Sequence, residues 1–136
     1  MRIVSLTLAA LLAGTLAAWA QDVSKSPPPA PYQQVSKLVK LPDFVPGLGQ
    51  LFVDPATLPA GPFLGYDHDG KLVSTIYMIP VEDLNPDKTF DNLAAPGGSV
   101  DHVDVYFNAG HPGVEKPHAH VVLWHVPADG EGSVAK

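Results

Sequence analysis

Apolar and polar positions alternate most regularly toward the end of the chain, in residues 100–107. Successive side chains of a strand point to opposite faces, so this alternation predicts a β-strand. One face carries Val103, Val105 and Phe107, and the other carries His102, Asp104 and Tyr106. Residues 118–126 predict the next strand, and glycines and a proline between the two favour a chain reversal. We therefore expect a C-terminal hairpin.

Two further strands are expected earlier in the chain. Residues 71–79 are rich in β-branched and aromatic side chains and follow an Asp-Gly turn signal, which predicts a well-buried strand. Residues 51–53 predict a short strand after a glycine-containing turn. The 15 prolines recur along the chain and exclude a long uninterrupted helix.

Helical signals are short. The spacing of Val35, Leu38 and Val39 favours one short helix within residues 32–41, and residues 81–84 predict a single helical turn. The predicted fold class is α+β and mostly β, a small antiparallel sheet with a C-terminal hairpin and one or two short helices.

The chain divides into three segments by composition. Residues 1–20 resemble a secretory signal peptide, with one positive residue, an apolar run and a small-x-small pattern. Residues 21–31 are rich in proline and serine and predict an extended tether outside the core. Residues 32–136 are expected to form a single β-rich domain. We expect an exported protein, periplasmic or extracellular, with no membrane contact after signal cleavage; an uncleaved N-terminal anchor is the alternative.

Charge and cysteine content exclude several classes of protein. The 136 residues include 8 Lys+Arg and 14 Asp+Glu, a formal net charge of −6, so no nucleic acid partner is expected. The absence of cysteine excludes disulfides, thiolate metal sites and a cysteine nucleophile. Six histidines are many for so few charged residues, and five of them lie between positions 102 and 125.

These histidines suggest a metal site on the hairpin. His118 and His120 share one face of their strand, and two imidazoles so placed can bind one ion. His102 and Asp104 form a second pair with the same parity, so direct pairing of the two strands would bring four N/O ligands together. Such a set suits a divalent Zn, Cu, Mn or Fe ion. Two accessory candidates are His111, which we expect mainly to serve its turn, and Tyr106.

Three other interpretations fit the same pattern. The polar face of the hairpin could simply meet solvent while its apolar face packs inside. The histidine face could be the interface of a homo-oligomeric assembly protein, with Tyr106 and Trp124 as buried aromatic anchors. A metal-dependent, cupin-like enzyme is the third, although the cupin glutamate is missing and only 16 residues follow His120. We favour a binding module over an enzyme.

Two groups of short motifs carry a family resemblance. Residues 61–65 (GPFLG), 69–73 (DGKLV) and 77–80 (YMIP) form the first, and residues 101–105 (DHVDV), 108–113 (NAGHPG) and 117–118 (PH) form the second. Together they resemble a family of small, uncharacterised bacterial proteins in which a Gly-His-Pro loop precedes a strand that begins with Pro-His. The resemblance spans residues 61–127 and implies a β-rich, ring-forming protein in which His111 and His118 matter. The Asp and second His of the family's strand correspond to His120 and Val122 here.

Overall fold

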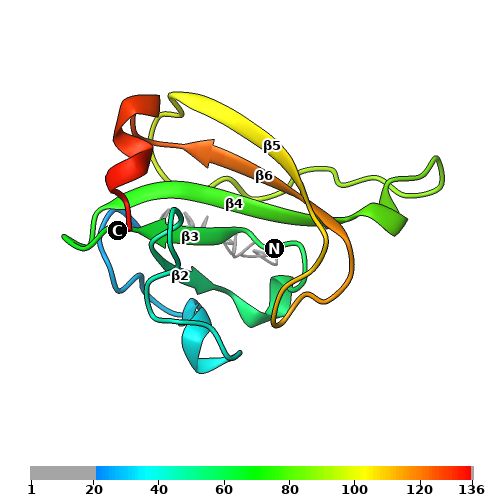
Figure 1. The fold of residues 1–136 in the computed structure, drawn as a ribbon, viewed down its shortest axis with the longest axis horizontal. Helices are drawn as coiled ribbons and strands as arrows, with labels where there is room; N and C mark the ends of the chain where they lie inside the picture. Colours follow the sequence, from blue (N-terminus) through cyan, green and yellow to red (C-terminus); the bar gives the residue numbers. More distant parts are fainter. Residues whose placement is uncertain (1–20, 136) are drawn as a thin grey trace, which may run out of the picture.

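One antiparallel sheet organises residues 21–135, the part of the chain that the computed structural model describes (Figure 1). The expected signal peptide of residues 1–20 lies outside this range. The sheet has six strands in the order β1-β2-β3-β4-β6-β5. They are β1 Gln33–Gln34, β2 Gln50–Val53, β3 Phe63–Tyr66, β4 Leu72–Pro80, β5 His102–Asn108 and β6 His118–Trp124. The predicted antiparallel, mostly β fold with a C-terminal hairpin is confirmed.

The sheet of the described residues is open, with β1 and β5 at its edges. Its six strands do not close on themselves, so the cupin-like barrel considered above is not formed by residues 21–135. No helix within that range is both long and apolar enough to cross a membrane.

The helical content of the described residues consists of short 3-10 turns. They are η1 Val35–Lys37, η2 Pro55–Thr57, η3 Val81–Asp83 and η4 Ala128–Ser133. The turn expected over residues 81–84 is confirmed, and the short helix expected within residues 32–41 is present as the single 3-10 turn η1. Gln33 and Gln34, which precede this turn, pair with Val53 and Phe52 of β2. A short helix has a nucleation cost that few hydrogen bonds offset, so η1 is limited to one turn.

Sequence analysis predicted neither the two-residue strand β1 nor strand β3. In β3, Leu64 and Tyr66 are fully buried between β2 and β4. At Gly65, an added Cβ atom would lie 2.4 Å from the Ser74 hydroxyl oxygen and 2.8 Å from the Leu48 carbonyl oxygen. The glycine therefore serves the close packing of neighbouring strands rather than a turn.

The tether prediction also needs correction at Val23. This side chain is only 5% exposed and packs with Leu64 and Tyr66 in a cluster that includes Phe52. The Tyr66 hydroxyl donates a 2.8 Å hydrogen bond to the Val23 carbonyl, and Lys25 bridges to Lys71 beside β4. Residues 21–31 lack a long regular element, as expected, but part of the segment belongs to the core.

Strand β5 turns its polar face inward and its apolar face outward, the reverse of a hairpin whose apolar face packs inside. Its apolar side chains are exposed, at 52% for Val103, 68% for Val105 and 66% for Phe107. The polar face of β5 instead lies on the same side of the sheet as Val122 and Trp124, which are buried in the larger core cluster. Pairing with β6 enforces this arrangement, because the face that β6 buries determines the face that β5 turns inward.

Candidate metal centre

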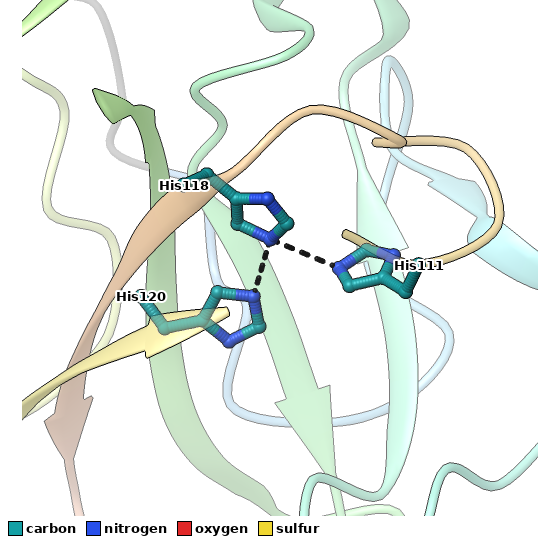
Figure 2. Close-up of side chains that lie close together, drawn as sticks. All are labelled: His111, His118 and His120. Atoms are coloured by element: carbon teal, nitrogen blue, oxygen red, sulfur yellow. Dashed lines mark hydrogen bonds between the residues drawn. The ribbon is translucent and has the colours of Figure 1, made fainter. Parts of the chain in front are cut away.

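Three histidines meet where β6 begins (Figure 2). His118 and His120 project from the same buried face of β6, at 0% and 4% exposure, as their spacing predicts. His111 reaches them from the loop between β5 and β6, in the turn closed by its two backbone hydrogen bonds with Val114. The His118 Nε2 atom lies 2.9 Å from His120 Nε2 and 3.2 Å from His111 Nε2. All three Nε2 atoms therefore converge on one small volume.

Carbonyl groups define the tautomer of two of the three rings. The His118 Nδ1–H donates to the Lys116 carbonyl at 2.7 Å, and the His111 Nδ1–H donates to the Pro112 carbonyl at 3.1 Å. A carbonyl oxygen only accepts, so in the neutral rings these Nδ1 atoms hold the hydrogen and both Nε2 atoms present lone pairs. Two lone pairs facing each other repel unless a proton or a metal ion lies between them. An Nδ1–H bonded to a carbonyl is also the usual arrangement behind a ligating imidazole.

His120 is held in its neutral form. Burial, assisted by the neighbouring His118 and His111, lowers the pKa of His120 from 6.5 to about 4. The hydroxyl of Tyr106, which lies opposite on β5, is 3.0 Å from His120 Nδ1. Burial raises the pKa of Tyr106, so this hydroxyl keeps its proton and can orient the ring. Tyr106 thus has the accessory position that its strand parity suggested.

The donor set of the three histidines suits a transition metal ion. Bonds of ~2.0–2.1 Å in a tetrahedral site place neighbouring ligand nitrogens roughly 3.3 Å apart, close to the Nε2 separations of this cluster. Three neutral imidazoles leave a fourth position for water or another ligand. The cluster of His111, His118 and His120 could therefore hold a metal ion.

The structure does not bring His102 and Asp104 into this cluster. Strand pairing is direct, as predicted, but the register sets Tyr106 opposite His120 and His102 opposite Trp124. Tyr106 lies four positions after His102, which corresponds to ~13 Å along a strand. The predicted group of four ligands is thus divided, because parity alone does not determine register. His111 takes the place that sequence analysis gave to the second pair, in addition to the turn role expected of it.

His102 and Asp104 join a second group at the C-terminal turn η4. Nδ1 of His102 lies 2.9 Å from an Asp101 carboxylate oxygen, and Nε2 lies 2.6 Å from a Glu131 carboxylate oxygen. Asp104 accepts a 2.9 Å hydrogen bond from the Trp124 indole nitrogen. Hydrogen bonds to Asp101 and Glu131 raise the pKa of His102. The spacing of His102, Asp104 and Glu131 is also compatible with an ion, but a ring that donates from both nitrogens is an imidazolium and has no lone pair to ligate.

The remaining two histidines have separate structural environments. His125 faces the opposite side of the sheet, as its parity predicts, where Nε2 lies 2.9 Å from the Thr75 hydroxyl. His68 stacks on Phe44 with ring centroids 4.1 Å apart, next to the Asp67 turn. Neither belongs to a metal-compatible group among the described residues.

The participation of His111 could have been found by the family resemblance but not by strand parity. The loop turns back because Gly110 and Gly113 adopt positive φ values of 129° and 89°. At Gly113 an added Cβ atom would come within 2.8 Å of Val39, so this loop packs closely on the segment around η1. The position of His111 is therefore determined by a contact between residues far apart in the sequence.

Comparison with known proteins points to one family. The family model described as TTHB210-like, hypothetical protein TTHB210, matches residues 67–107. The crystal structure of hypothetical protein TTHB210 from Thermus thermophilus is similar at 42% sequence identity and a TM-score of 0.62. The match covers 69% of this chain and 92% of that one. No curated protein matches the chain. The matched family region ends at Phe107, before the three histidines.

Proposed function

The chain belongs to the TTHB210-like family, and from the geometry of its own histidines we propose that it is a binding protein for a divalent transition metal ion, held by His111, His118 and His120. One observation carries the proposal: two carbonyl-bonded imidazoles direct their Nε2 lone pairs at each other across 3.2 Å, with the Nε2 of a third nearby. A metal ion between them turns this repulsion into coordination. Zn, Cu, Mn and Fe all accept imidazole ligands, and no thiolate is present to favour a softer ion.

Equilibrium dialysis of the full chain against Zn²⁺, followed by metal analysis, tests the proposal. We expect about one bound ion per chain, because three imidazole ligands and water complete a tetrahedral site. His111→Asn, in a partly exposed loop, should weaken binding at least about ten-fold, and adding His118→Asn and His120→Asn should abolish it. His68→Asn is the matched control, since it removes a histidine outside the cluster. Equal zinc binding by wild type and the triple variant would refute the site.

Stability and pH provide independent measurements of the same site. Zinc at about 100 times its dissociation constant should raise the free energy of unfolding by about 2.7 kcal/mol, and EDTA should reverse the gain. Affinity should fall as the pH is lowered, because protons compete for the ligand nitrogens. The lowered pKa of His120 keeps its nitrogen available until the pH approaches about 4.

Export is part of the proposal and rests on the residue pattern of positions 1–20. Cleavage after Ala20 would leave Gln21 as the first residue of the secreted protein. Mass spectrometry of the protein from the periplasmic or extracellular fraction measures this directly, and an intact N-terminal methionine there would contradict cleavage.

A homo-oligomeric assembly is a second candidate function, but its interface must differ from the histidine face. Trp124, considered above as an interface anchor, is only 4% exposed and packs in the core of its own chain. The exposed side chains Val103, Val105 and Phe107 instead form an apolar stripe on the edge strand β5. Apolar edge strands favour association with another chain.

Light scattering tests the oligomeric candidate. Wild type should have a mass above that of one chain at high micromolar concentration, and Val105→Lys should lower it because a charge enters the apolar stripe. Val81→Lys is the control, since Val81 is 42% exposed and lies in η3 rather than on β5. A monomeric wild type would contradict this candidate function without affecting the metal site.

A further inference from the structure

A cavity of about 410 Å³ adjoins the three histidines. Its floor is the inner face of the sheet, including Phe63, Ile76 and Met78, and its cover comes from residues 35–48. Met78 pairs with His120 across β4 and β6, so the floor continues directly into the metal centre. Volumes of ~300–1,000 Å³ are typical of small-molecule pockets. This cavity is therefore large enough for a small ligand beside the candidate metal ion.

The wall of the cavity is chemically uneven. No Lys, Arg, Asp or Glu is among its lining residues in the described chain, and most of the wall is aliphatic. The side chains with polar groups are Tyr106, Asn108, His111 and His120, and all come from β5, β6 or the loop that joins them. The cavity thus has an aliphatic body and one polar end, which is the end that contains two of the proposed metal ligands.

The cavity opens to solvent beside two exposed leucines. Leu38 and Leu58 line it and are 40% and 47% exposed. Val39 and Val45 of the cover are only partly buried against the core cluster. A ligand with an aliphatic chain would cover such surface, and each methylene that it buries should strengthen binding about four-fold.

We propose that the metal-loaded protein binds a small monocarboxylate with an aliphatic body, whose carboxylate takes the open metal position while the body fills the cavity. This inference rests on the metal site proposed above. A carboxylate buried among aliphatic side chains needs a nearby positive charge. The lining residues supply no lysine or arginine, so the bound metal ion provides that charge. The same carboxylate binds weakly when the ion is removed.

Decanoate and decanol form the probe pair, with Co²⁺ as the metal because its visible absorption reports its coordination. Decanoate should change the visible spectrum of the cobalt-loaded chain and bind about ten-fold or more tightly than decanol, a difference of ~1.4 kcal/mol. EDTA should remove this preference. Each methylene removed from decanoate should weaken binding about four-fold, as burial of the chain requires.

One pair of variants separates the cavity from the metal site. Leu38→Asp places a charge at the cavity entrance and should weaken decanoate binding about five-fold or more while cobalt affinity is unchanged. Leu84→Asp is the matched control, because Leu84 is 60% exposed and does not line the cavity. It should alter neither affinity.

The possible outcomes distinguish this inference from the metal proposal. Cobalt binding without any spectral response to decanoate would overturn the carboxylate inference and leave the metal site intact. Equal binding of decanoate and decanol, with or without cobalt, would show that the cavity binds the aliphatic chain and that the metal ion does not bind the carboxylate. This result would also overturn the carboxylate inference. A chain that binds no cobalt would overturn both proposals. If chains associate and close the cavity, decanoate binding should fail at high protein concentration. That result would contradict a free small-molecule site.

Discussion

Histidines of this chain differ in charge because their ring nitrogens face different partners. His120 is buried beside two other imidazoles, so its pKa falls to about 4 and the ring is neutral near pH 7. His102 lies between the carboxylates of Asp101 and Glu131, which raise its pKa and favour the imidazolium. The same residue type is thus suited to bind a metal in one place and to pair with carboxylates in the other.

At His102 this difference predicts a pH dependence of stability. Its folded pKa lies above the unfolded value of 6.5, so its stabilising contribution is complete below that value and is lost as the pH rises through the raised pKa. The free energy of unfolding of wild type should therefore exceed that of His102→Gln by more at pH 6 than at pH 9. Urea denaturation at both values measures the two differences.

One further variant completes this test. Glu131→Gln should reduce the same pH dependence, because it neutralises one of the carboxylates that raise the pKa of His102. His102 also faces Asp104, whose charge raises the pKa in the same direction and is retained in both variants. A wild-type advantage that is the same at pH 6 and pH 9 would show that the contact contributes by packing alone.

At the scale of elements, the register of β5 on β6 decides the site. Parity correctly placed His118 and His120 together, and direct pairing of the strands was predicted correctly. The register then set Tyr106, rather than His102, opposite His120. It also turned the polar face of β5 inward and left Val105 at 68% exposure. A strand whose apolar side faces outward leaves a surface available for a partner chain.

The N-terminal segment is an element whose contribution to stability can be measured. Val23 is 5% exposed against Leu64 and Tyr66. Val23→Ala should therefore lower the free energy of unfolding by about 1–3 kcal/mol, since it removes buried methyl groups and leaves a cavity. Val103→Ala is the matched control at 52% exposure and should change stability by less than about 0.5 kcal/mol.

Chemical denaturation of both variants gives the comparison. A loss at Val23 no greater than the loss at Val103 would mean that residues 21–31 behave as the free tether that their composition suggested. Such a result would contradict the packing of this segment on β3 and β4.

At the scale of the whole molecule, the predictable part of the fold was the part with strong local signals. Strands β2, β4, β5 and β6 and the turn η3 follow from β-branched residues, alternation and turn residues near their positions. Strand β3 was missed because its glycine serves a contact with Ser74 and Leu48, both distant in sequence. The helix expected within residues 32–41 is limited to the single 3-10 turn η1, because Gln33 and Gln34 before it pair with β2.

In the candidate site too, the residues predicted correctly are those that a local pattern specifies. Sequence analysis identified His118 and His120 as a pair and Tyr106 as an accessory group, because these inferences need only the two-residue period of a strand. It grouped His102 and Asp104 with them wrongly, because their distance depends on register. His111 entered the cluster through a loop conformation that two positive-φ glycines and a contact with Val39 determine.

The sequence by itself therefore determined the β-rich class of the fold, the absence of thiolate chemistry and the concentration of histidines near the C-terminal hairpin. These follow from composition and from local periodicity. Only the tertiary structure decided which histidines meet, which face of β5 lies inside and that an aliphatic cavity adjoins the cluster. Each of those properties depends on strand register or on packing between segments distant in the chain. The local pattern of a single sequence determines neither the register nor that packing.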